Sequence, residues 1–510
     1  PGGSAEKPAR VAILVAHGMG QQVKFETLEL VVNALRRAAR AGGRTASDAD
    51  VRQVPLGDDF LPRAEMTLTA GGSPREVHLY EAYWAPLTEG RISTPETFWF
   101  LVQAGWLGLS RAWRGGMKRL MFGDWQHFRV RRRTALAFLL ATLTALALFV
   151  MNAVLLAAVA SRGLGPASAH WPTGPLLADL TVDFLLVVGA VLALMLPGLA
   201  LPLWLRRRRA DHTLALPPAW LSAAGNALMG VLAVAIVLGG ALVAYHLVRH
   251  AGAHSGPMWR HAGFDRLVGP LAKTPGTSAG LCTTALTLVL WGAIAGLGVR
   301  ARHFLLQYVG DVAIYVSAYS VNRFYETRHA IHAAVGAVAR GVYGLRDAAG
   351  AAAYDRIVVV GHSLGSVIAY DALDRVIRED PDPLGPGGAA RRTGALVTFG
   401  SPLDKTAFIF RSQQSEDSQV REALAESVQP LIDAYEFRPP RWINLWSRFD
   451  WISGALDYYD LDASHRPAGG ANPKYVENRE DREASTPLQA HVEYWDGALL
   501  AETLWGEVMR

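Results

Sequence analysis

Apolar positions along the chain follow several patterns, and each pattern predicts a kind of element. Short continuous apolar runs predict buried parallel strands at Val11–Ala16, Ile357–Val360 and Ala395–Phe399. After the first two runs, apolar residues recur three or four positions apart and predict amphipathic helices. Bulky and polar residues alternate over Val77–Trp84, which predicts a further strand. Strands that alternate with helices in this way indicate an α/β fold.

Four much longer apolar segments lie in the sequence after Trp84 and before Ile357. Each exceeds the roughly 20 residues that cross a bilayer, and none has a central Lys or Arg, so they predict transmembrane helices. They cover approximately Thr134–Ala160, Leu176–Leu205, Ser222–Val248 and Ala279–Val299. Arginines cluster before the first segment, after the second and after the fourth, which favours the cytoplasm for both chain ends. We expect a multi-pass protein, as in a bacterial inner membrane.

The segment before these apolar stretches mixes aromatic and basic residues. Trp99, Trp106 and Trp113 are interleaved with arginines and lysines, a composition typical of helices that lie at a membrane interface. Charges interrupt the segment too often for it to span the bilayer. The predicted divisions of the chain are therefore 1–96, the interfacial segment 97–133, a four-helix transmembrane block 134–302, and 303–510.

Composition agrees with this division. Of the 510 residues, 51% are hydrophobic, which is high for a soluble protein, and the formal net charge is only +5 at pH 7. Basic residues cluster beside apolar runs, so membrane lipids and not nucleic acid are the expected partners. The single Cys282 excludes an intrachain disulfide, and the polar start Pro1–Arg10 does not have the pattern of a secretory signal. Nothing in the sequence indicates an oligomeric state.

Candidate catalytic residues lie where the predicted strands end. The run Ile357–Val360 is followed by Gly361-His362-Ser363-Leu364-Gly365, a G-x-S-x-G pattern between a strand and a helix. A serine at the apex of such a tight turn projects its hydroxyl away from the backbone, and small residues two positions to either side leave room for the turn. Ser363 is therefore the candidate nucleophile.

The first strand ends in a glycine-rich loop, His17-Gly18-Met19-Gly20. A loop of this kind can aim backbone N–H groups at the carbonyl oxygen that becomes an anion during acyl transfer. An ordinary strand-to-helix connection is the alternative interpretation, because glycines suit both.

The stretch GHSLG followed by SVIAYDAL resembles the lipase and esterase branch of the α/β-hydrolase superfamily. The resemblance implies a catalytic serine, acid and histidine in that order along the chain. It also implies an oxyanion hole made by the amides of Met19 and Leu364, with His17 bracing its loop and not transferring protons. The residues that would support the two loops are His17, Gly18, Gly20, Gly361, His362 and Gly365.

The candidate acid and the candidate base lie after the nucleophile in the sequence. Asp450 follows the strand-like run Arg441–Trp446 and is the expected acid. Its rivals are Asp457, Asp460 and Asp404. For the base, His491 precedes a final helix-like segment near the C-terminus and is preferred to His465, which lies in a polar, glycine-containing run. A surface histidine that only caps the last helix is the alternative for His491.

Together these residues predict a membrane-embedded serine hydrolase that cleaves lipid carboxylic esters through an acyl-enzyme. An acyltransferase with the same triad and a catalytically silent scaffold are the alternatives. No Cys/His cluster suggests a metal, and the chemistry requires no organic cofactor. The two halves of the hydrolase domain must emerge on one side of the bilayer, which an even number of crossings allows. Residues 403–438 occupy the place of a lid.

Overall fold

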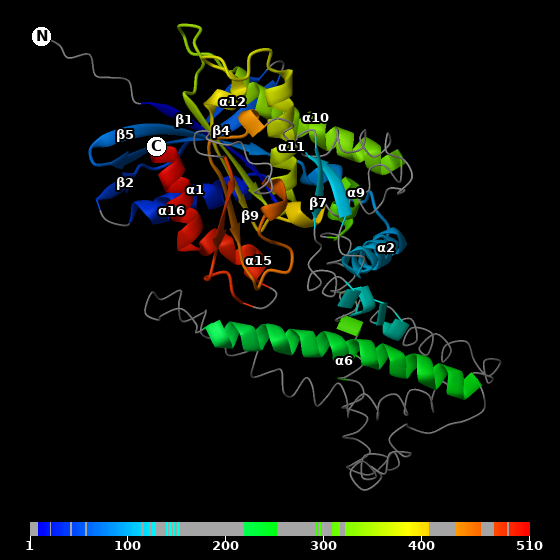
Figure 1. Cartoon of the computed structure of the whole chain (residues 1–510). Coiled ribbons are helices and arrows are strands. Elements are labelled where there is room, and N and C mark those ends of the chain that lie inside the picture. Colours follow the sequence, from blue (N-terminus) through cyan, green and yellow to red (C-terminus); the bar gives the residue numbers. More distant parts are fainter. Residues whose placement is uncertain are drawn as a thin grey trace, which may run out of the picture. The chain divides into compact units, whose positions relative to one another are not determined.

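One nine-stranded sheet joins the N-terminal and C-terminal parts of the chain (Figure 1). Its order is β11-β10-β9-β8-β1-β5-β4-β2, with β3 paired to β4. Neighbours from β11 to β5 are parallel, and the pairs that involve β4 are antiparallel. The strands are β1 (Arg10–Ala16), β2 (Arg44–Ala46), β3 (Asp50–Leu56), β4 (Asp59–Ala70), β5 (Ser73–Ala82), β8 (Arg356–His362), β9 (Thr393–Phe399), β10 (Trp442–Trp446) and β11 (Val476–Glu480). The predicted α/β fold is confirmed at this level.

The structure describes 9–20, 22–40, 43–56, 59–113, 117–121, 124–128, parts of 139–152, 219–251, parts of 289–299, 309–316, 322–406, 435–460, 474–486 and 489–510. The chain forms two compact units. Unit 1 comprises Pro1–Ser93, Leu107–Thr134 and Gln307–Arg510, and unit 2 comprises Thr94–Trp106 and Ala135–Leu306. The sheet belongs to unit 1, so the sequence of unit 2 interrupts the sequence of unit 1.

Helices cover both faces of the sheet (Figure 1). On one face, α1 (Glu26–Ala39) and α16 (Ala498–Met509) pack against the odd-numbered residues 11, 13 and 15 of β1. On the other face, α10 (Asn322–Gly344) and α11 (Leu364–Glu379) pack against the even-numbered residues 12, 14 and 16. Because successive side chains of a strand point to opposite faces, a strand covered on both sides must be apolar at every position. This explains the unbroken apolar runs of β1 and β8.

The register brings several strand ends to one edge of the sheet. Ala16 at the end of β1 pairs with Gly361 in β8, and Phe399 at the end of β9 pairs with both His362 and Leu445. In open α/β sheets, ligands bind outside the carboxyl ends of the parallel strands. The loops that follow β1, β8, β9 and β10 therefore share the edge where a site is expected.

Further helices complete the described secondary structure. The helices are α2 (Thr94–Trp113), α6 (Ala219–Ala251), α9 (Gly310–Val316), α12 (Ala389–Arg392) and α15 (Ala490–Glu493), with 3-10 turns at Ala85–Leu87, Tyr435–Phe437, Asp457–Tyr459 and Tyr494–Asp496. Among the described residues of the predicted interfacial segment 97–133, those up to Trp113 are helical. Beyond it, β6 (Met117–Met121) and β7 (Asp124–Phe128) form an antiparallel hairpin. A mixture of aromatic and basic residues alone does not distinguish helix from strand, because aromatic side chains also favour strands.

None of the helices in the described part of the chain is long and apolar enough to cross a membrane. Three of the predicted spans lie largely outside the described residues, and the remaining one, Ser222–Val248, falls within α6. The four-helix transmembrane block therefore stays a prediction. Cys282 and residues 407–434 of the lid-like segment also lie outside the described part.

A buried carboxylate holds the C-terminal helix α16 to the sheet. Glu507 is 2% exposed and accepts hydrogen bonds from Arg441 Nε at 2.7 Å and Arg356 Nη2 at 3.0 Å. We expect Glu507→Ala to lower the free energy of unfolding by about 2–3 kcal/mol, because two partly buried arginines lose their common counter-ion. Urea unfolding measures this. Glu502→Ala, which removes an exposed partner of Arg44 from the same helix, should cost less than about 1 kcal/mol. Equal losses in the two variants would contradict the account.

Candidate active site

Ser363 sits on a strained turn between β8 and α11. Its φ of 53° and ψ of −132° make it one of two non-glycine residues with positive φ in the described part of the chain. The Ser363 N–H donates to the Phe399 carbonyl at 3.0 Å, which ties the turn to β9. A Cβ on Gly365 would lie 2.1 Å from the His17 carbonyl oxygen, and one on Gly361 would lie 2.4 Å from the Ser366 Cα. The turn can therefore form only with glycine at both positions.

His491 lies between Ser363 and Asp450. Its Nε2 is 2.8 Å from the Ser363 Oγ, and its Nδ1 is 3.0 Å from the Asp450 Oδ2. A carboxylate accepts, so the Nδ1–H donates to Asp450, and the free Nε2 accepts the Ser363 hydroxyl proton. The three side chains come from the turn after β8, the loop after β10 and the short helix α15. This is the arrangement in which an imidazole can take a proton from a serine.

Further donors fix the carboxylate of Asp450. The Ile452 N–H donates to its Oδ1 at 2.9 Å, and the Tyr494 hydroxyl donates to its Oδ2 at 3.0 Å. Burial by itself favours the protonated acid, but His491 and the hydrogen bonds to Ile452 and Ser453 outweigh it and lower the pKa of Asp450 below its usual range. The acid is therefore ionised at neutral pH and can stabilise a positively charged His491.

The other candidate acids pair with residues other than His491. Asp404 pairs with Lys405 at 3.2 Å, and Asp460 pairs with Arg438 at 3.1 Å and accepts from the Val476 N–H. Asp457 accepts from the Asn478 side chain. His465, the rival base, lies outside the described residues. Of the acids considered from the sequence, Asp450 is the one that the structure brings to His491.

The loop after β1 lies against the nucleophile. A Cβ on Gly18 would come within 3.0 Å of the Ser363 Cβ and 2.9 Å of the His362 Nδ1, so the backbone approaches as closely as a glycine allows. Leu364, the other predicted oxyanion donor, is the first residue of α11. Its N–H is one of the first-turn amides that lack a partner within their own helix, and the positive end of the helix dipole lies there. Of the two predicted donors, Met19 therefore belongs to the loop that lies against Ser363, and Leu364 directly follows Ser363 at the start of α11.

His17 is buried and its tautomer follows from its neighbours. Its Nε2 accepts from the backbone N–H groups of Trp84 at 2.9 Å and Ala85 at 3.2 Å, so its proton is on Nδ1, which donates to the Gly18 carbonyl at 2.8 Å. Burial lowers the pKa of His17 to about 4, against a smaller opposing effect of the Gly18 hydrogen bond. A neutral imidazole committed to three backbone groups agrees with the predicted bracing role.

His362 also carries a role that the sequence did not reveal. Its ring stacks on Phe399, and its Nε2–H donates to the His491 carbonyl at 3.0 Å. Burial and the neighbouring His491 lower the pKa of His362 to about 3. The side chain before the nucleophile therefore fixes the backbone of the residue that faces it. Tyr494 was missed too, although its place three residues after His491 could have suggested a second contact with the acid.

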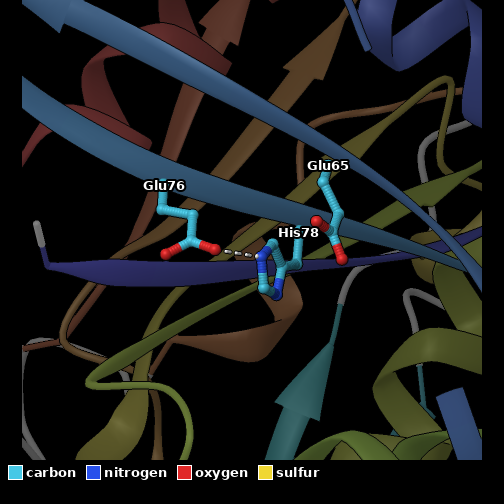
Figure 2. Close-up of side chains that lie close together, drawn as sticks. All are labelled: Glu65, Glu76 and His78. Atoms are coloured by element: carbon cyan, nitrogen blue, oxygen red, sulfur yellow. Dashed lines mark hydrogen bonds and ion pairs between the residues drawn. The ribbon is translucent and has the colours of Figure 1, made fainter. Parts of the chain in front are cut away.

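A separate group of possible metal ligands lies at the amino end of β1. Among the described residues, Glu65, Glu76 and His78 are close enough to share an ion, and Figure 2 shows the hydrogen bond between Glu76 and His78. Arginines already neutralise both carboxylates, at 2.7 Å for Glu76 and at 2.6 and 3.2 Å for Glu65. The second ring nitrogen of His78 bonds to the Tyr354 hydroxyl. Positive charge and occupied ligand atoms both oppose a cation here.

Comparisons with family models, with curated proteins and with solved structures give no match for this chain. The resemblance to α/β-hydrolases therefore stays a prediction from the motif. Any functional conclusion depends on the geometry described above.

The two buried neutral histidines make stability depend on pH. His17 and His362 bind protons more weakly in the folded chain than in the unfolded chain, whose histidine pKa is near 6.5. Their stabilising effect is complete above pH 6.5 and is lost as the pH falls toward the pKa values of the folded chain, about 4 for His17 and about 3 for His362. At about 1.4 kcal/mol per pKa unit, we expect each to cost about 2–3 kcal/mol between pH 7 and pH 4.5.

Denaturant unfolding over this pH range measures the loss. His362→Gln, which has no titrating group, should show a shallower pH dependence than the unaltered chain. A free energy of unfolding that stays constant between pH 7 and pH 4.5 would show that the two imidazoles do not have these environments.

Proposed function

We propose that the chain is a serine hydrolase of the α/β-hydrolase type that cleaves carboxylic esters through an acyl-enzyme. The observation that carries the proposal is the chain of hydrogen bonds from Ser363 through His491 to Asp450, at 2.8 and 3.0 Å. A hydrogen-bonded serine, histidine and carboxylate at the carboxyl ends of parallel strands has the geometry needed for nucleophilic acyl transfer. A scaffold without activity would not need Asp450 to be fixed by several donors.

In the proposed reaction, the Ser363 Oγ attacks the ester carbonyl carbon while its proton passes to the His491 Nε2. Asp450 stabilises the imidazolium, and the amides of Met19 and Leu364 hold the negative oxygen of the tetrahedral intermediate. The C–O bond to the alcohol then breaks, and His491 returns the proton to the departing oxygen. Water, deprotonated by His491, then attacks the acyl carbon. The bond from this carbon to the Ser363 Oγ breaks, His491 returns the proton to the Oγ, and the acid is released. An acceptor alcohol in place of water would make the reaction an acyl transfer.

Lipid esters are the proposed substrate class. Trp99, Trp106 and Trp113 lie seven residues apart on α2, a spacing that places them on one face of a helix, and they are 67, 68 and 77% exposed. Large exposed aromatic side chains on one helix face are typical of contact with the lipid headgroup region. The apolar segments of the sequence between residues 134 and 302 support the proposal of an integral membrane protein, and the arginine clusters beside them support the cytoplasm for both ends.

Labelling with a fluorophosphonate tests the proposed nucleophile. Ser363→Ala should abolish labelling because the reagent bonds to the activated hydroxyl. Asp450→Asn should lower kcat for a p-nitrophenyl ester by roughly 10³–10⁴-fold, because the amide cannot hold His491 in the required tautomer. Ser73→Ala, at the exposed first residue of β5, is the matched serine control and should label normally. Undiminished labelling of Ser363→Ala would remove Ser363 as the nucleophile.

Fluorescence in liposomes tests the proposed lipid contact of α2. Lipids brominated near the headgroup should quench the wild-type chain more than a variant in which Trp99, Trp106 and Trp113 are all phenylalanine, because these tryptophans would lie within reach of the bromine. The variant should keep its activity on a soluble ester and lose activity on bilayer lipid by about tenfold, the loss of roughly 1.4 kcal/mol of interfacial contact. Equal quenching in the two proteins would contradict the lipid contact.

A further inference from the structure

The two peptide groups that flank Met19 are each held by a side chain. The Gly18 carbonyl accepts from His17 at 2.8 Å, and the Gly20 N–H donates to the Asp311 Oδ2 at 2.8 Å. The carbonyl and N–H of a trans peptide point in opposite directions. The Met19 N–H therefore points away from the His17 ring, and the Met19 carbonyl points away from Asp311, where the Gln22 side chain donates to it at 3.3 Å.

Asp311 comes from a part of the chain far from this loop. It is the second residue of α9 (Gly310–Val316), which follows unit 2 in the sequence, and it is 5% exposed. Burial raises the pKa of Asp311 to about 6, against the hydrogen bonds from Gly20 and Thr88, so at pH 7 the carboxyl is mostly ionised. A charged acceptor makes a shorter and stronger hydrogen bond to an N–H than a neutral one does.

We infer that Asp311 is a positioning residue for the oxyanion hole, fixing the Met19 amide by holding the peptide group that follows it. The inference rests on the proposed function, because it assigns a purpose to a contact that a non-catalytic loop would not need. With His17 on one side and Asp311 on the other, the φ and ψ of Met19 are both set before substrate binds. An oxyanion donor that is fixed in advance costs no reorganisation during the reaction.

A second buried aspartate provides a matched control. Asp371 on α11 accepts from the Tyr315 hydroxyl of α9 and pairs with Arg328 at 3.4 Å and His332 at 3.1 Å on α10. It has a burial similar to that of Asp311 and contacts the same helix α9, but within the described part of the chain it forms no hydrogen bond or ion pair with the loop after β1. Asp371→Asn should therefore weaken packing around α9 without misplacing the Met19 amide.

The test compares D311L, D311N and D371N in the full chain, with kcat and KM for p-nitrophenyl butyrate and the inhibition constant of a trifluoromethyl ketone. D311L removes the acceptor and should lower kcat by roughly 10–100-fold, while KM stays within about twofold of the wild-type value. This fall in kcat is somewhat smaller than the one expected for complete loss of an oxyanion donor. D311L should weaken the ketone, whose adduct carries an oxyanion, by a similar factor. D311N keeps an acceptor oxygen and should recover kcat to within about threefold of wild type, as should D371N.

Equal falls of kcat in D311L and D371N, or a rise of KM at constant kcat in D311L, would overturn the assignment. If D311L does not fold, D311S, whose side chain is too short to reach Gly20, carries the same expectation. A wild-type chain that neither labels nor hydrolyses would refute the proposed function and this inference with it. If D311L labels at Ser363 as fast as the wild-type chain, the positioning role of Asp311 is refuted and the proposed function is not.

Discussion

The pairing of β1 with β8 is the constraint on which the candidate site depends. These strands come from the first and the last of the three sequence segments of unit 1, and their parallel register sets the loop after β1 beside the turn after β8. Parallel pairing buried on both faces requires continuous apolar strands, which both have. The chemistry of the site is thus a consequence of sheet assembly: without this pair, Ser363 would have no glycine loop against it.

Around that pair, the site is made rigid by groups that do not react. Neutral histidines at positions 17 and 362 each donate to a backbone carbonyl, one in the glycine loop and one at His491. Asp311 holds the other end of the glycine loop, and Tyr494 holds Asp450. Buried polar groups of this kind are costly unless each is satisfied, so their arrangement fixes one geometry and excludes others. The strained backbone of Ser363 is retained by the same surroundings.

Much of this arrangement could be predicted from the sequence, and the reason is local. Continuous apolar runs predict the buried strands. The glycines around Ser363 predict a tight turn, because such a turn admits almost no side chain. Edge strands such as β11, VENRE, carry little apolar signal because one side meets solvent, and the β6–β7 hairpin shares its composition with a helix. Contacts such as that of Asp311 with Gly20 join residues that no local pattern relates. They follow only from the assembled sheet and its helices.

The most direct test of the account is the structure of the chain with a phosphonate bonded to the Ser363 Oγ. The phosphonyl oxygen stands for the oxyanion of the tetrahedral intermediate, and we expect it within about 2.7–3.1 Å of the amide nitrogens of both Met19 and Leu364. His491 should remain between the modified serine and Asp450. A phosphonyl oxygen turned away from both amides, or a phosphonate bonded to a residue other than Ser363, would contradict the account.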